Sequence, residues 1–172
     1  MSEVGRIMAI DYGDKRTGLA LCEESGRIVV PYDVITEEDQ AKLISKLASV
    51  IQSEGIEHVV IGLPLTMSGE TGGRAIKTET FGKALSAALG SEVKLAYEDE
   101  RLTSYAAEKA LAATGMKLRK MKGKVDAVAA CEILRTYLKR IAPHLEDRAE
   151  IGAEDMPWEK PSFDRRRARK SR

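Results

Sequence analysis

Carboxylates stand at three places in this sequence where a protein could use them for chemistry. Asp11 directly follows an apolar stretch, and Gly13 leaves the backbone beside it free to turn. Residues 98–100 are three adjacent acids, whose like charges repel unless water or a cation separates them. Asp126 shares a helical face with alanines, where a carboxylate is costly unless it is paired. Together these positions predict an all-oxygen site for Mg²⁺ or Mn²⁺.

Each carboxylate also has a structural interpretation when it is taken singly. An acid in the position of Asp11 is often a turn residue, and one in the position of Asp126 often stabilises a helix N-terminus. Zinc is disfavoured, because His58 and His144 are isolated from each other and no cysteine spacing suits it. The argument for a site therefore depends on whether the fold brings the acids together.

Basic residues lie beside the acids in the sequence, and we expect them to bind the phosphates of a nucleic acid. These candidates are Lys15, Arg16, Arg74, Arg101, Lys122 and Lys124. Arg101 either pairs with the neighbouring acids or holds a phosphate through two hydrogen bonds. The glycine-rich loop 66–74 precedes a predicted helix and suits anion binding, although a mobile surface loop fits it almost equally well.

The elements that must position these residues follow from the hydrophobic pattern. Short strands are predicted over 6–10, 19–22 and 28–30 as an antiparallel meander, and further strands over 59–63 and 93–97. Helical spacing is found at 43–51, 76–89, 104–114 and 128–141, with Thr36 as the first N-cap and Gly55 and Gly90 as stops. The pattern predicts an α/β fold with a mixed sheet. Ligands of such sheets lie beyond the carboxyl ends of strands, which nominates Asp11, the loop after residue 63 and residues 98–100.

Length and composition bound the remaining possibilities. The 172 residues suit one domain, which we place at 1–145, followed by an acidic and then Arg/Lys-rich flexible tail at 146–172. Net charge is +1, which excludes a uniformly basic coat and leaves room for a local basic face. Two distant cysteines, no secretory signal and no long apolar run predict a cytoplasmic protein without a membrane span.

Four segments, in this order, resemble the successive signatures of the YqgF/RuvX family: residues 10–20, 60–65 with Gly69, 99–103 and 122–126. The resemblance runs from about residue 6 to residue 142. It implies an RNase H-like fold, with a five-stranded mixed sheet flanked by helices. It also implies a catalytic and metal-binding triad at Asp11, Glu100 and Asp126. Which of Glu98, Asp99 and Glu100 binds metal stays open at this point.

The family contains Holliday junction resolvases and nucleases that mature the precursor of 16S ribosomal RNA. The resemblance therefore implies a metal-dependent endonuclease that hydrolyses phosphodiester bonds. We expect two Mg²⁺ or Mn²⁺ ions with Asp11 bridging them, and RNA as substrate at the 5′ end of pre-16S rRNA. The alternative is resolution of branched DNA, which would favour a homodimer over a monomer.

Two other classes compete with a nuclease. Asp11, Gly13 and Gly18 also resemble the first phosphate-binding loop of actin-like ATPases. Those proteins close two such domains over ATP, whereas this chain has room for one. A non-catalytic RNA-binding module is the other alternative, and the complete set of acids argues against it.

Overall fold

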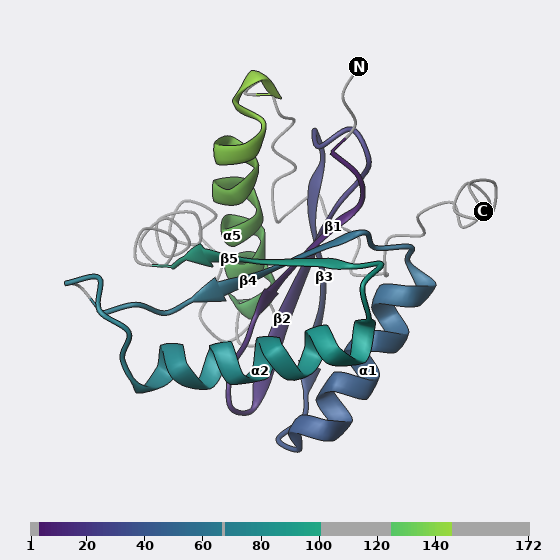
Figure 1. Cartoon of the computed structure of the whole chain (residues 1–172). Helices are drawn as coiled ribbons and strands as arrows, with labels where there is room; N and C mark the ends of the chain where they lie inside the picture. Colours follow the sequence, from purple (N-terminus) through teal and green to yellow (C-terminus); the bar gives the residue numbers. More distant parts are fainter. Residues whose placement is uncertain (1–3, 67, 101–124, 146–172) are drawn as a thin grey trace.

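Short runs of buried residues build a single mixed sheet in the part of the chain that the structure describes, residues 4–66, 68–100 and 125–145 (Figure 1). The structure is a computed structural model. Its strands are β1 (Ile7–Asp11), β2 (Arg16–Cys22), β3 (Val29–Thr36), β4 (His58–Leu63) and β5 (Lys94–Asp99). Their order in the sheet is β3-β2-β1-β4-β5. The first three strands pair antiparallel, whereas β4 and β5 run parallel to β1, which confirms the predicted five-stranded mixed sheet.

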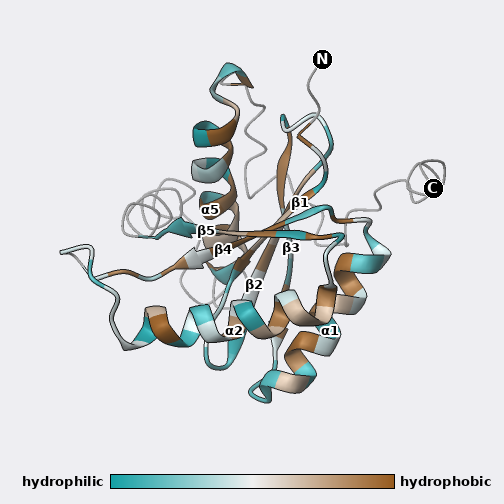
Figure 2. Ribbon diagram, viewed as in Figure 1, coloured by the Kyte–Doolittle hydropathy of each residue, from teal (hydrophilic) through white to brown (hydrophobic). Residues whose placement is uncertain are grey.

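Helices cover the two faces of the sheet (Figure 1). They are α1 (Gln40–Ser53), α2 (Gly73–Leu89) and α5 (Val125–Ile141), and a short 3₁₀ turn, η1, follows at Pro143–Leu145. One core contains Met8, Ile10 and the buried faces of α1 and α2, while a second contains Ile7, Ala9 and the buried face of α5. Figure 2 shows the hydrophobic residues running along the central strands, between these layers. Successive side chains of β1 therefore point into the two cores alternately, as the two-residue period of a strand requires.

Two predicted boundaries in the meander are wrong. The strand predicted at 19–22 begins at Arg16, because its ladder with β3 extends as far as the Arg16–Thr36 pair. The strand predicted at 28–30 continues to Thr36 through Pro31. Proline cannot donate to a ladder, and β3 tolerates it because it lies at the edge of the sheet.

Helix limits follow local signals. The N-cap of α1 is Asp39, not Thr36, and its side chain accepts a hydrogen bond from the backbone N–H of Lys42. Gly55 and Gly90 have positive φ angles of 64° and 77°, as expected of glycines that end helices. The helix predicted at 104–114 and the predicted tail at 146–172 lie outside the described residues. Within the described part of the chain, no helix is long and apolar enough to cross a membrane.

Candidate active site

Asp11 ends the central strand of the sheet. Strand alternation places it on the same face as Ile7 and Ala9, whose side chains pack in the core beneath α5. The residues before it in β1 are buried, and Asp11 itself is half-buried. Its carboxylate is therefore presented at the carboxyl edge of the strands, on the α5 side of the sheet.

The side chain of Glu100 lies against Gly62 of β4 and meets that of Asp11. Its backbone N–H donates to the carbonyl of Leu63 at 3.1 Å, which continues the pairing of β5 with β4 by one residue. A Cβ atom on Gly62 would lie 2.1 Å from Oε1 of Glu100, so any larger residue there would displace the carboxylate. The side chains of Glu100 and Asp11 share a hydrogen bond. Gly62 thus creates the space in which two carboxyl groups meet.

Asp126 lies on the β2 side of Asp11, where its backbone packs against a second glycine, Gly18. Gly18 of β2 pairs with Asp11, and a Cβ atom on Gly18 would lie 1.9 Å from the backbone oxygen of Asp126. The first turn of α5 therefore rests directly on β2, beside the end of β1. Oδ2 of Asp126 lies 3.3 Å from Nε of Arg16.

Burial and like charge change the protonation of this cluster. Burial, followed by the neighbouring carboxylates of Glu100 and Asp126, raises the pKa of Asp11 to about 8, against a lowering by Arg74. Burial also raises the pKa of Glu100, and burial raises that of Asp126 although the Arg16 guanidinium opposes it. A divalent cation could supply the positive charge that a proton supplies here.

The donor set suits Mg²⁺ or Mn²⁺, since it consists of carboxylate oxygens. Oδ2 of Asp126 is moreover buried and makes no hydrogen bond within the described part of the chain. The acids are nevertheless arranged as two plus one: Asp11 and Glu100 face each other, while Asp126 contacts Arg16. Accordingly, among the described residues, no group of three or more His, Cys, Asp or Glu side chains is arranged to hold a metal ion.

The structure separates the three adjacent acids. Oε2 of Glu98 accepts hydrogen bonds from Nη2 and Nε of Arg140 at 2.7 and 3.2 Å, and Glu98 is buried. Glu100 instead contacts Asp11, and the negative charge of Asp99 helps to raise the pKa of Glu100. Of the three acids, Glu100 is therefore the one whose carboxyl group meets that of Asp11.

Of the basic candidates, Arg74 and Arg16 lie by the acids. Arg74, in the first turn of α2, lowers the pKa of both Asp11 and Glu100 through its charge. Lys15 lies 3.9 Å from Glu38, and both side chains are largely exposed. Arg101, Lys122 and Lys124 lie outside the described residues.

The structural roles of four residues were not anticipated from the sequence. Gly18 and Gly62 admit Asp126 and Glu100, and a glycine inside an apolar strand is a known sign of close backbone approach. Lys77 forms an ion pair with Asp14. Tyr12 stacks on Phe81, with ring centroids 4.1 Å apart and planes 2° apart. The last two contacts fasten the β1–β2 loop to α2.

Comparisons with known proteins agree with this arrangement. The family model described as "RuvX: Holliday junction resolvase" matches residues 5–140. Two relatives carry the name "Putative pre-16S rRNA nuclease". The one from Chloroflexus aurantiacus is 41% identical over 132 residues, covering 77% of this chain and 85% of the relative. The one from Syntrophus aciditrophicus is 36% identical over 137 residues, covering 80% and 90%.

Two solved structures share the fold. RuvC of T. thermophilus, in complex with a Holliday junction substrate, gives a TM-score of 0.53 at 12% identity and covers 80% of this chain and 96% of its own. The Fowlpox virus resolvase, in complex with junction DNA, gives 0.53 at 12% identity and covers 80% and 99%. The predicted RNase H-like fold is confirmed.

Proposed function

The chain belongs to the RuvX family, a family of nucleases that hydrolyse phosphodiester bonds, and we propose that it processes the 5′ end of pre-16S rRNA with divalent metal ions held by Asp11, Glu100 and Asp126. The observation that carries the proposal is the meeting of Asp11 and Glu100 at the end of the central strand, with Asp126 beside them. Three acids from β1, the end of β5 and α5 would have little reason to converge in a structural core.

The roles of the residues follow from their positions. Metal ions bound there would activate the attacking water and stabilise the leaving oxygen. Asp11, Glu100 and Asp126 would hold these ions through their carboxylate oxygens. Arg74 lies on the Asp11–Glu100 side and is placed to bind the phosphate that is cleaved. No histidine or lysine is required as a base, because a bound metal lowers the pKa of its water.

RNA is favoured as substrate by the relatives that are 36–41% identical to this chain and are named for pre-16S rRNA. That substrate would place the enzyme in the cytoplasm. The second candidate is resolution of four-way DNA junctions, which the description of the family favours. The two functions use the same bond cleavage and differ in the nucleic acid that the surface accepts.

The test is incubation of the full chain with Mn²⁺ or Mg²⁺ and either precursor rRNA ends or four-way DNA junctions. Asp11→Asn should abolish cleavage while nucleic-acid binding is kept, and Asp33→Asn, the same change in edge strand β3, should cleave as the wild type does. Undiminished cleavage by Asp11→Asn would refute the site. Cleavage of junctions with none of RNA would reverse the order of the two functions.

A further inference from the structure

Arg16 lies against one of the three acids of the candidate site. Its Nε atom is 3.3 Å from Oδ2 of Asp126. In β2, Arg16 and Gly18 point to the same face as Ala20 and Cys22, which pack in the core beneath α5. The contact is therefore built into the fold, since the glycine that admits the first turn of α5 lies two residues from the arginine that meets its side chain.

The contact with Arg16 balances the negative charge of Asp126 but does not supply a hydrogen bond to its Oδ2 atom. Oδ2 is buried and makes no hydrogen bond to the described residues, so the guanidinium supplies charge in an imperfect geometry. About half of the Arg16 side chain is exposed, against 23% of Asp126. The arginine is therefore the partner that lies nearer to solvent, whereas the carboxylate is held on the first turn of α5.

This contact accounts for the division of the acids into two plus one. Asp11 and Glu100 are joined by a hydrogen bond, and Asp126 is engaged by Arg16. For Oδ2 of Asp126 to bind a cation together with Asp11 and Glu100, it must exchange its guanidinium partner. Two positive groups cannot both lie against one buried oxygen without strong repulsion.

We propose that Arg16 is the resident counter-ion of Asp126, and that a divalent cation must displace its guanidinium before Asp126 joins Asp11 and Glu100. The inference rests on the proposed function, because it takes these acids as metal ligands. Arg16 thus lowers the affinity of the site for metal. Once displaced, its guanidinium remains at the edge of the site, where it is placed to bind a phosphate of the substrate.

The test is the affinity of the full metal-free chain for Mn²⁺, measured by isothermal titration calorimetry at pH 8. Arg16→Gln should bind Mn²⁺ about tenfold more tightly than the wild type, which corresponds to about 1.4 kcal/mol. Arg16→Lys should fall between them, because it keeps the charge but not the planar guanidinium. Lys15→Gln is the matched control: it removes the same charge from the adjacent residue, whose partner is Glu38, and should change the affinity less than twofold.

Equal or weaker Mn²⁺ binding by Arg16→Gln, in a variant with the circular dichroism spectrum of the wild type, would overturn the inference. So would an equal gain in Lys15→Gln, which would indicate net charge alone. Asp11→Asn separates this failure from that of the proposed function. If Asp11→Asn binds Mn²⁺ as the wild type does, the metal site itself is refuted. If it loses binding while Arg16→Gln matches the wild type, only the role of Arg16 is refuted.

Discussion

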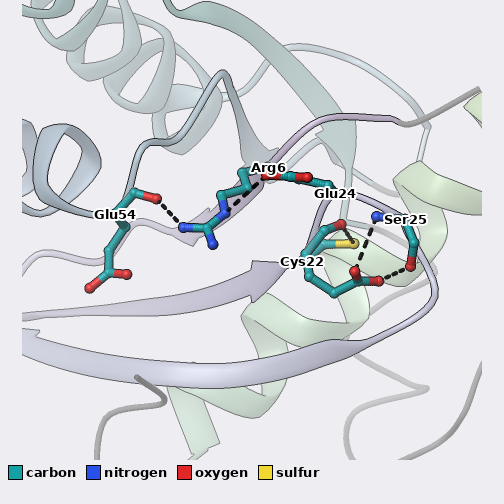
Figure 3. A network of polar contacts seen from close by, with 6 residues as sticks. Arg6, Cys22, Glu24, Ser25 and Glu54 are labelled. Atoms are coloured by element: carbon teal, nitrogen blue, oxygen red, sulfur yellow. Dashed lines mark hydrogen bonds and ion pairs between the residues drawn. The ribbon is translucent and has the colours of Figure 1, made fainter. Parts of the chain in front are cut away.

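The two ends of β1 hold their buried charges in opposite ways. At the amino end, Nη1 of Arg6 donates to the backbone oxygen of Glu54 at 2.7 Å, and its Nε lies 3.9 Å from Glu24 (Figure 3). The carboxylate of Glu54 is buried and accepts a hydrogen bond from the hydroxyl of Tyr32 at 2.9 Å. The Arg6 guanidinium thus meets an acceptor and an opposite charge, and the Glu54 carboxylate meets a donor, although Nε of Arg6 makes no hydrogen bond within the described part of the chain.

At the carboxyl end of β1, acidic side chains contact one another. Asp11 and Glu100 share one hydrogen bond, and burial together with their neighbours raises the pKa of Asp11 to about 8. Such a cluster destabilises the folded chain unless protons or cations neutralise it. The amino end thus stabilises the sheet, whereas the carboxyl end gives up stability, as expected of the cation site that we propose there.

The largest expected effect comes from the same chemical change at the two ends. Glu100→Gln removes a ligand charge and should slow metal-dependent cleavage about a thousandfold. Glu54→Gln keeps an oxygen for the Tyr32 hydroxyl and should leave cleavage within about twofold while lowering the free energy of unfolding by about 1 kcal/mol. Single-turnover cleavage and urea unfolding measure the two effects. Equal losses of cleavage in both variants would break the comparison.

The position of α5 at the carboxyl end of β1 depends on its close approach to the backbone of β2 at Gly18. A pair of Gly→Ala variants tests this dependence. In Gly18→Ala the new methyl would meet the backbone of Asp126, so α5 must shift, and we expect a loss of about 3 kcal/mol in the free energy of unfolding. In Gly73→Ala nothing lies within 4 Å of the new Cβ, so stability should stay the same or rise by about 0.5 kcal/mol. Urea denaturation measures both.

A second readout makes the glycine test specific to the site. Gly18→Ala should also weaken Mn²⁺ binding, because the shift of α5 carries Asp126 with it. Gly73→Ala is the control for changed chain entropy and should bind Mn²⁺ as the wild type does. A Gly18→Ala variant as stable as Gly73→Ala would show that α5 does not depend on this close approach.

The sequence was sufficient to predict which segments form the strands of the sheet, because the signals for them are local. Gly55 and Gly90 mark helix ends through their backbone conformation, and the apolar run at 59–63 matches β4. The extent of β2 and β3 was not predictable in this way. Their ladders are set by pairing between strands, so Arg16 and Pro31 joined strands that their own residue types do not favour.

In the candidate site, too, features encoded in one segment were predictable, and those that depend on contacts between segments were not. The resemblance implies a triad at Asp11, Glu100 and Asp126 through motifs that are each readable in one short segment. The period of a strand puts Glu98 and Glu100 on one face and cannot separate them. Only the position of α5, which brings Arg140 to Glu98, separates their roles. The contact between Arg16 and Asp126 joins segments far apart in the chain, and no local pattern encodes it.

The smallest expected effect is a pH dependence that belongs to the carboxyl end alone. The pKa of Asp11 is about 8 in the folded protein and about 3.9 when unfolded, so between these values the folded state binds more protons than the unfolded state. Asp11 therefore lowers the free energy of unfolding as the pH rises from about 4 to 8. Measured with a chelator, Asp11→Asn should gain about 1–2 kcal/mol relative to the wild type from pH 5 to pH 8, a partial effect because Glu100 shares the proton.

Tyr32→Phe is the control for this prediction at the amino end of β1. It removes the hydroxyl that Glu54 accepts from, so it should lower the free energy of unfolding by about 1–2 kcal/mol, by the same amount at both pH values. Mn²⁺ should stabilise the wild type more at pH 8 than at pH 5, because it competes with protons for the acids, and this gain should vanish in Asp11→Asn. If the difference between Asp11→Asn and the wild type were constant with pH, the carboxyl end would be as well neutralised as the amino end, and the contrast between them would not hold.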